Sequence, residues 1–269
     1  MDVETPSHAA GRPFAGDTAT FYARYRREYP PELILRLQEF SRDGRSRLLD
    51  LGCGTGQLGL QLASFFEQVV AIDPEADMLR EATRAGSERN VRNIECVRAD
   101  SRDLPRLEQT LGSFDLVTIG TAFHFMEPRT TLATLQRIAA AGAVAVAYNG
   151  SPMWLHPDPW AQALRRSLEA RLGPVGDTDF TDEAIKACET TMRDLGYTQI
   201  ERWARTYEET IDTDFVIGHM LSAISTVQIP PTQRRAFADE IRKALETIAP
   251  SGRVTETVPV RAVIGRPAA

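Results

Sequence analysis

The chain has 269 residues, of which 42% are hydrophobic and 25% charged, values typical of a globular protein with a sizeable core. Its formal net charge of −6 at pH 7 argues against a nucleic-acid partner, because such a partner usually requires a basic surface. The same negative charge is compatible with a cationic small molecule. The length allows one large α/β domain or a domain with an inserted cap.

Membrane, secreted and metal-binding proteins are also disfavoured. No apolar run of about 18 residues occurs, so no membrane span is expected, and Met1 to Pro13 lacks the apolar region of a secretory leader. The cysteines form no C-x-x-C pair, which favours reduced thiols in a cytoplasmic protein, and the histidines have no metal-ligand spacing. These residues are Cys53, Cys96 and Cys188, and His8, His124, His156 and His219. Monomer and homodimer both stay open.

The first part of the chain is predicted to be loose, then aromatic, then helical. Residues 1–16 are rich in glycine, proline and polar residues. Segment 14–31 concentrates aromatic residues with arginines between them, and two interpretations stay open: a helix that packs on the domain, or a lid over a ligand site. An amphipathic helix is predicted from Pro31 to Phe40, with its end at Asp43 and Gly44.

A glycine-rich stretch follows at residues 47–63. Its apolar run of leucines breaks on three glycines, after which apolar residues return. This order predicts a buried strand, a tight turn and the start of a helix that reaches about Phe66. Glycines allow a sharp turn and close approach of a ligand, and the N–H groups of a helix start favour a polar or anionic group. The glycines are Gly52, Gly54 and Gly56.

This turn differs from the dinucleotide-binding pattern G-x-G-x-x-G, because its third glycine, Gly56, comes one position too early. The next apolar run, 69–73, ends in Asp73, and an acidic residue at this place can bind the two hydroxyls of a ribose. Pro74 fits the first turn of the helix that follows, in which Met78 is expected to face inward.

Strands and helices alternate five times between residues 47 and 148, which is the pattern of a parallel, doubly wound sheet. Ligands of such sheets bind at the carboxyl ends of the strands, where the glycine turn, Asp73 and Asp100 are expected to meet. The further strands of this part are predicted at 94–100, 114–120 and 143–148, with a helix at 130–140.

Beyond Asn149 the periodicity loosens. The proline- and aromatic-rich segment 151–160 predicts a loop. The remaining predicted elements are helices at 160–172, 181–195, 214–227 and 232–248, and strands at 198–211 and 253–264.

The run Asp50-Leu51-Gly52-Cys53-Gly54-Thr55-Gly56, with Asp73 at the end of the next strand, resembles motif I of the class I S-adenosylmethionine (SAM) dependent methyltransferases. Residues 100–105 resemble the adenine-binding motif of this family. Residues 114–128 resemble its F-D-x-V…A-x-H-W-x pattern, with Phe125 in place of the usual tryptophan. The similarity is to the small-molecule type of enzyme.

The resemblance implies an α/β fold: a Rossmann-like, doubly wound sheet of seven mostly parallel strands, the last one antiparallel. It further implies an N-terminal helical lid and a helical cap inserted after the fifth strand. Segments 151–180 and 214–227 would then cover the site of the methyl acceptor. The expected divisions are a lid at 1–30, a SAM-binding core at 31–150, a cap with late sheet elements at 151–230, and a C-terminal helix and strand at 231–269.

The resemblance also implies SAM as the methyl donor, with S-adenosylhomocysteine as its product. Arg26 would meet the carboxylate of SAM, and Asp100 the exocyclic amine of its adenine. A cap on a short helical turn is the alternative for Asp100, and plain packing is the alternative for Met78. The cofactor-binding candidates are Tyr25, Arg26, Gly52, Cys53, Gly54, Thr55, Gly56, Asp73, Pro74, Met78, Asp100, Ser101 and Thr121.

His124 follows the fourth strand and is the tentative catalytic base, because the pKa of histidine suits proton transfer near neutral pH. The alternative is a wall residue that makes structural hydrogen bonds. The acceptor-binding candidates are Tyr22, Phe123, His124, Trp154, His156 and Trp160. The last three could instead pack the inserted segment.

The predicted function is transfer of a methyl group from SAM to an oxygen or nitrogen of a small-molecule metabolite, as in natural product biosynthesis, by in-line displacement driven mainly by proximity. One alternative is a methyltransferase that acts on a nucleic acid or a protein. Another is a non-catalytic SAM- or nucleotide-binding module. Residues 120–123 lack the N/D-P-P-Y/F/W motif common in amino-methylating nucleic-acid enzymes, which disfavours a nucleic-acid acceptor.

Overall fold

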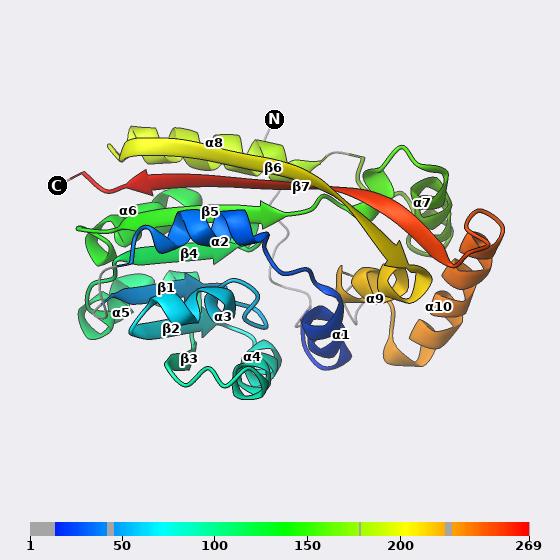
Figure 1. The fold of residues 1–269 in the computed structure, drawn as a ribbon, viewed down its shortest axis with the longest axis horizontal. Helices are drawn as coiled ribbons and strands as arrows, with labels where there is room; N and C mark the ends of the chain where they lie inside the picture. Colours follow the sequence, from blue (N-terminus) through cyan, green and yellow to red (C-terminus); the bar gives the residue numbers. More distant parts are fainter. Residues whose placement is uncertain (1–13, 42–45, 178, 224–227, 269) are drawn as a thin grey trace.

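A computed structural model describes residues 14–41, 46–177, 179–223 and 228–268. Its centre is a seven-stranded sheet in the order β3-β2-β1-β4-β5-β7-β6 (Figure 1). Strands β1 to β5 pair in parallel, whereas β7 lies antiparallel between β5 and β6. The predicted α/β fold, with seven mostly parallel strands and the last one antiparallel, is confirmed.

The elements follow the predicted order. The strands are β1 Arg47–Leu51, β2 Gln68–Asp73, β3 Ile94–Arg98, β4 Leu116–Gly120, β5 Ala143–Asn149, β6 Thr198–Asp212 and β7 Arg253–Arg266. The α-helices are α1 Asp17–Tyr25, α2 Pro31–Gln38, α3 Gly59–Leu62, α4 Ala76–Glu88, α5 Leu104–Leu111, α6 Pro128–Ile138, α7 Pro159–Leu172, α8 Phe180–Asp194, α9 Thr213–Ala223 and α10 Pro231–Glu246. Four short 3-10 helices are η1 Ala63–Phe65, η2 Ser101–Asp103, η3 Phe123–Phe125 and η4 Met153–Leu155.

Two elements differ from the sequence prediction. The helix after the glycine turn is broken into α3 and η1, and α5 was not predicted as a helix. Pro105 stands in the first turn of α5, where a missing N–H costs nothing, and Gly112 ends the helix with a φ of 71°. The predicted loose start at 1–13, the stop at residues 43–44 and the end of the predicted helix 214–227 lie outside the described residues.

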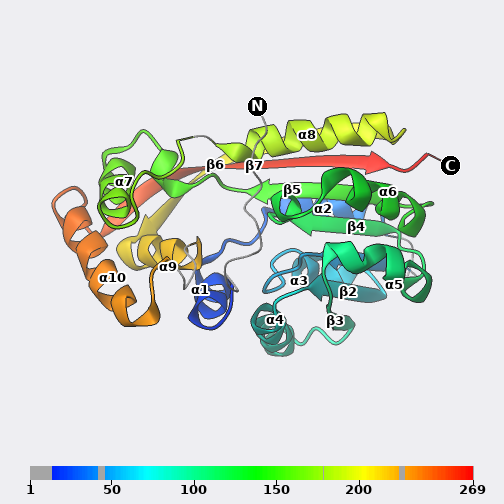
Figure 2. The same ribbon diagram turned by 180° about the vertical axis from the view of Figure 1, so that it is seen from behind.

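Helices cover both faces of the sheet (Figures 1 and 2). On one face α2 and α3 bury apolar side chains such as Leu37 and Leu62 against the strands. On the other face α5, α6 and α8 do the same, with Leu104 and Leu135 among the buried residues. Because both faces are covered, the central strands are apolar on both sides, which explains their continuous hydrophobic runs.

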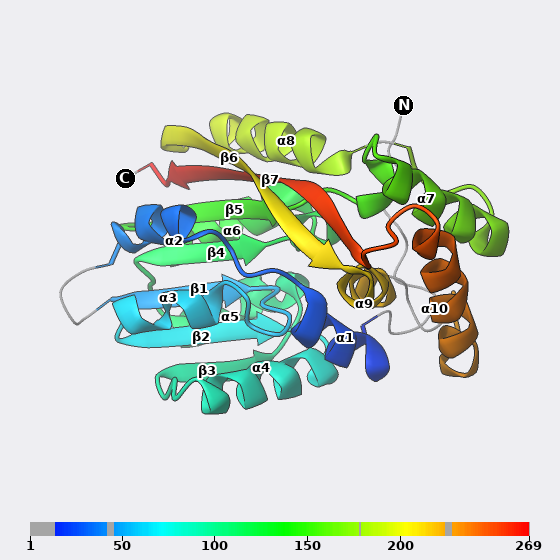
Figure 3. The same cartoon turned by 45° about the vertical axis from the view of Figure 1, so that its right-hand side comes forward.

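A third hydrophobic core lies beyond the end of the sheet. Residues 260–265 of β7 pair with β5, whereas residues 253–259 pair with β6 alone, so these two strands continue as a two-stranded extension. Figure 3 shows this extension running towards α9 and α10. Around it α7, α9 and α10 bury Trp160, Met220 and Phe237 in one cluster. We call these three helices the cap; α10, expected in the C-terminal division, packs within it.

A buried carboxylate ties β1 to its neighbours. Asp50 is 1% exposed; its Oδ1 accepts a hydrogen bond of 2.9 Å from Thr118 Oγ1 in β4, and its Oδ2 accepts one of 2.9 Å from the N–H of Gly59 in α3. Burial disfavours the charged form and raises the pKa of Asp50 to about 6. Residue 59 must be glycine, because a Cβ there would lie 2.7 Å from Oδ2.

Replacing Asp50 with alanine should lower the free energy of unfolding by about 2–4 kcal/mol, because two buried donors lose their acceptor. Asp50→Asn is the matched control: its amide oxygen can accept from Gly59 and its NH₂ can donate to Thr118, so its loss should be clearly smaller. Urea unfolding followed by circular dichroism measures both. An alanine variant as stable as the wild type would show that Asp50 does not tie these elements together.

Candidate functional site

The glycine turn joins β1 to α3 at the carboxyl edge of the sheet. Gly52, Gly54 and Gly56 have φ angles of 68°, 55° and 89°, which residues with a Cβ rarely adopt. At Gly52 a Cβ would also lie 2.7 Å from the Cβ of Ala122, just beyond β4. The backbone is therefore both left-handed and closely packed here, so the turn presents its main chain, rather than side chains, at the edge of the sheet.

Asp73, the last residue of β2, holds this turn from one side. Its Oδ2 accepts from the N–H of Gly54 at 2.9 Å, and its Oδ1 accepts from the N–H of Glu75 at 2.8 Å. Because the side chain is mostly buried, the pKa of Asp73 is raised to about 6. The predicted ribose-binding carboxylate thus lies next to the glycine turn and orders it.

Asp100, beyond the end of β3, caps a helical turn. Its Oδ1 accepts from the N–H of Arg102 at 2.9 Å, and its own N–H donates to Asp103 Oδ2 at 2.9 Å, which is a capping box. The Arg102 side chain holds the pKa of Asp100 below its usual value. The cap left open as an alternative is therefore present, while adenine binding by Asp100 and by Ser101, which begins η2, stays a prediction.

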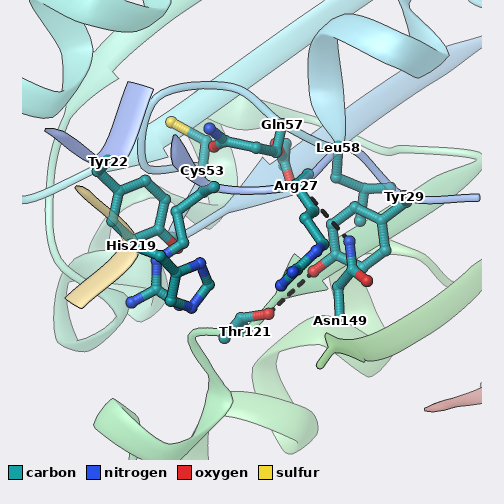
Figure 4. A pocket seen from close by; sticks show the side chains of 13 residues that line it. Tyr22, Arg27, Tyr29, Cys53, Gln57, Leu58, Thr121, Asn149 and His219 are labelled. Carbon is teal, nitrogen blue, oxygen red and sulfur yellow. Dashed lines mark hydrogen bonds between the residues drawn. The ribbon is translucent and has the colours of Figure 1, made fainter. Parts of the chain in front are cut away.

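A small cavity of about 30 Å³ lies between the glycine turn, the residues after α1 and the end of β4 (Figure 4). Four predicted cofactor residues line it, namely Arg26, Gly52, Cys53 and Thr121. Its volume is about the share of one molecule in liquid water. The side chains around it, Tyr22 among them, therefore already occupy the space that a larger ligand would need.

The end of β4 is strained at this cavity. Thr121 has a φ of 51°, which is unusual for a β-branched residue, and its Oγ1 lies 3.1 Å from the hydroxyl of Tyr29. Tyr29 is itself buried, and a Cβ at Gly120 would lie 2.8 Å from its hydroxyl oxygen. Strain of this kind persists only where the surroundings hold it, and it clusters at binding sites.

Arg26 is the buried cation of the site. Its Nε donates to Ser222 Oγ at 2.8 Å, and its guanidinium lies 4.8 Å from the ring centroid of Tyr22. Among the described residues no carboxylate lies within ion-pair distance of it, in contrast to Arg27, which pairs with Glu209 and Glu256. Burial lowers the pKa of Arg26 without neutralising it, so the side chain carries an unpaired charge at the cavity.

The first helix lies across the site and joins the core to the cap. In α1 Tyr22 lies over the glycine turn, with its Cε1 3.7 Å from where a Cβ of Gly54 would stand. The helix packs against α4 and α9, and the N–H of Gly16 donates to Asp77 in α4 at 2.5 Å. The ring of Tyr25, a predicted cofactor residue, packs on Gly218 of α9 and lines neither cavity described here.

A second cavity, of about 230 Å³, adjoins the first and shares five lining residues with it. The shared residues are Tyr22, Arg26, Thr121, Asn149 and His219. Three predicted acceptor residues line the larger cavity, namely Tyr22, His124 and Trp154. Any molecule in this cavity would therefore lie next to one held at the glycine turn.

His124 lies at the larger cavity among aromatic rings. Its ring centroid is 3.9 Å from that of Phe125 and 5.0 Å from that of Phe180, and its Nδ1 is 3.4 Å from the hydroxyl of Tyr148. Burial, and then the charge of Arg26, lower the pKa of His124 to about 4. The imidazole is therefore neutral at pH 7.

Several candidates lie away from both cavities. Phe123 is buried in the core below α6. Trp160 belongs to the cap core, where its Nε1 donates to the carbonyl of Thr255 at 3.2 Å, and His156 is buried 3.6 Å from Glu256. Thr55 is buried in the glycine turn, Pro74 precedes α4, and Met78 is buried within α4. The further candidates that line neither cavity are Gly54, Thr55, Gly56, Asp73, Pro74, Met78, Asp100 and Ser101.

Several residues that line the cavities were not predicted as site residues, among them His219, Asn149 and Phe180. His219 stands in α9, within the segment expected to cover an acceptor site, but this apolar helix is buried around most of its surface, so no signal singled out this one side chain. Asn149 ends β5, where its position at the carboxyl edge of a parallel strand was a usable signal.

Comparison with known proteins identifies the class of this fold. Residues 48–142 match the family described as "Methyltransferase domain". The chain is 40% identical over 102 residues to cypemycin N-terminal methyltransferase of a Streptomyces species, covering 36% of this chain and 37% of that protein. It is 39% identical over 99 residues to demethylmenaquinone methyltransferase of Clavibacter sepedonicus, covering 36% and 38%. Alignments with the curated relatives span about a third to a half of those proteins' lengths.

A solved structure from Anaeromyxobacter dehalogenans, provisionally described as a type II methyltransferase, has the same fold, with a TM-score of 0.58, 24% identity, and coverage of 90% of this chain and 98% of that one. The match over residues 48–142 and the shared fold support a class I SAM-dependent methyltransferase domain, for which SAM is the methyl donor. The predicted resemblance to this family is thereby supported, whereas the roles of the residues in the glycine turn stay predictions.

Neither a membrane-spanning helix nor a metal centre is found among the described residues. No helix in that part of the chain is long and apolar enough to cross a bilayer. Within the same residues no group of three or more histidine, cysteine or acidic side chains is arranged to hold a metal ion.

Gly218→Ala tests the contact between α1 and α9, because a Cβ at this position would lie 2.2 Å from the nearest atom of the Tyr25 ring. Overpacking of this kind should lower the free energy of unfolding by about 1–3 kcal/mol. Displacing α1 should also speed trypsin cleavage at the arginines that end it. Gly176→Ala is the matched control, since no atom lies within 4 Å of its Cβ position. Equal behaviour of the two variants would show that α1 does not depend on this contact.

Proposed function

We propose that this protein is a SAM-dependent methyltransferase that transfers the methyl group to an oxygen or nitrogen of a small-molecule metabolite. The observation that carries the proposal is the pair of adjoining cavities at the carboxyl edge of the sheet, with five residues common to both. Transfer by in-line displacement requires donor and acceptor to share a wall in this way. Holding the two reactants together and aligned can account for about 7–11 kcal/mol of the barrier.

The residues at the glycine turn fit SAM, which would supply a methyl group activated on a sulfonium. Arg26, buried and without a carboxylate partner among the described residues, would bind the carboxylate of the donor. Asp73 would accept from the ribose hydroxyls, and Asp100 from the amine of adenine. The left-handed backbone of the three glycines would let the donor approach the main chain closely.

The N-terminal segment would act as the lid over this donor. Tyr22 and Arg26 fill the small cavity so far that a ligand as large as SAM requires them to move outward. Because α1 contacts both α4 and α9, its return would close the donor site and the acceptor site together. Closure of this kind excludes water and strengthens the electrostatic interactions inside.

The names of the two relatives described above give different acceptors, so they do not indicate the acceptor of this chain. The support for a small acceptor comes instead from the cavity. The acceptor cavity, of about 230 Å³, is enclosed by aromatic side chains, and the chain carries a net charge of −6. His124 would be a wall residue or base there, and its neutral ring leaves one nitrogen able to accept a proton.

Affinity for S-adenosylhomocysteine should depend on pH through Asp73. Ribose hydroxyls donate more strongly to an ionised carboxylate, so binding favours the ionised form, which predominates only above a pKa of about 6. The affinity measured by calorimetry should therefore rise by roughly tenfold between pH 5 and pH 7 and then level off.

Asp73→Asn should weaken binding by about 10- to 100-fold at pH 7, as expected for loss of a hydrogen bond to a charged group, and should remove the pH dependence. Asp194→Asn, on the exposed end of α8, is the control and should bind as the wild type does. Unchanged affinity of the Asp73 variant would reject the assignment of the donor site.

A further inference from the structure

The side chains that line the acceptor cavity indicate which class of acceptor it would bind. Its role as the acceptor site rests on the proposed methyltransferase function. Several aromatic rings line the cavity, among them Tyr22, Phe125, Trp154 and Phe180. Phe125 and Phe180 are 40% and 39% exposed, although both rings contact the ring of His124. Two large apolar rings left this exposed at one cavity would gain contact by stacking against a flat aromatic ligand.

Charge in the cavity disfavours a protonated amine. No acidic side chain lines it among the residues that the structure describes. Asp179, beside the lining residues Ser151 and Thr181, is already used: it accepts from Ser151 Oγ at 2.5 Å and Thr181 Oγ1 at 2.6 Å, and lies 3.8 Å from Arg261. Arg26 adds a positive charge at the wall, so a cationic acceptor would meet a like charge and no counter-charge.

His219 presents a proton acceptor to both cavities. Its Nδ1 lies 3.2 Å from the backbone carbonyl of Tyr25, and a carbonyl oxygen only accepts, so Nδ1 carries the proton and Nε2 holds the lone pair. Nε2 makes no hydrogen bond with any described residue. The tautomer of His124 is not fixed in this way, because its partner, the hydroxyl of Tyr148, can donate or accept.

The surroundings of His219 keep this lone pair available. Burial, and then the charges of Arg26 and Arg27, lower the pKa of His219 well below its usual value, so the ring is neutral at pH 7. Binding of a carboxylate to Arg26 would remove part of that repulsion. The basicity of Nε2 would then rise in the complex that holds the methyl donor.

We propose that the acceptor is a neutral aromatic compound with a hydroxyl nucleophile, whose ring packs against Phe125 and Phe180 and whose hydroxyl proton passes to Nε2 of His219. The hydroxyl oxygen attacks the methyl carbon of SAM. The O–C bond forms as the S–C bond breaks, and the bonding electrons stay on the sulfur of S-adenosylhomocysteine. The proton on His219 is released to water when the products leave.

The test of His219 compares two acceptors of different acidity. 2-Naphthol is un-ionised at pH 8, whereas 4-nitro-1-naphthol is already ionised and needs no base. For His219→Gln we expect kcat with 2-naphthol to fall by about 10²- to 10⁴-fold, and kcat with the nitro compound to fall much less. A purely structural role would lower both equally, and would overturn the assignment. His124→Gln run in parallel should not show this dependence on acidity; if it alone shows it, the base is His124.

The aromatic class is tested by Phe125→Leu and Phe180→Leu, with Phe65→Leu as the matched control, since Phe65 is 37% exposed on η1 and lines neither cavity. Phe125→Leu and Phe180→Leu should each raise KM for 2-naphthol about 3- to 10-fold, whereas Phe65→Leu should leave it unchanged. Methylation of 1-naphthylmethylamine in preference to 2-naphthol would overturn the acceptor class. If S-adenosylhomocysteine binds but neither naphthol is methylated, this inference alone fails; if S-adenosylhomocysteine does not bind, the proposed function fails too.

Discussion

The hydrogen bonds of Asp50 fix the carboxyl edge of the sheet, where the glycine turn and both cavities lie. One carboxylate joins β1 to β4 and to α3, and the glycine turn begins two residues later. Burial raises the pKa of Asp50 to about 6, and the hydrogen bonds from Thr118 and Gly59 oppose part of this rise by stabilising the carboxylate. Because Thr121 lies three residues beyond Thr118, the same bonds set the distance between the turn and the strained end of β4.

The fold was predictable because the parallel sheet imposes a repeating pattern that local sequence displays. Strands buried on both faces are continuous apolar runs, and the left-handed turn at Gly52 leaves a glycine that few other contexts require. The missed helix α5 shows the limit of this reasoning, since the 3-10 turn η2 that leads into it has a capping box that uses Asp100, a residue also suited to ligand binding. Where one side chain serves a local structure and a site, sequence alone favours neither.

The acceptor side was less predictable because its residues are brought together by packing between distant segments. Trp154, Trp160 and His156 lie close in sequence and share one composition, yet only Trp154 faces the cavity, while the other two are buried against the strand extension. His219 lies in a helix whose apolar residues point all round, which indicates a buried helix but not that one side chain reaches a cavity. The packing of α9 against α1 and the other elements around it places His219 there.

The strand extension affects how the sequence of such a protein can diverge. Residues 253–259 of β7 pair with β6 and with no other described strand, so the cap is carried on a two-stranded ribbon that extends beyond the parallel strands. Substitutions in α7, α9 or α10 can therefore reshape the larger cavity while the glycine turn keeps its geometry. The family match covers residues 48–142, so it includes the glycine turn but no residue of the ribbon or of the cap. The part of the chain that can vary with the cap is therefore a part that this match does not include.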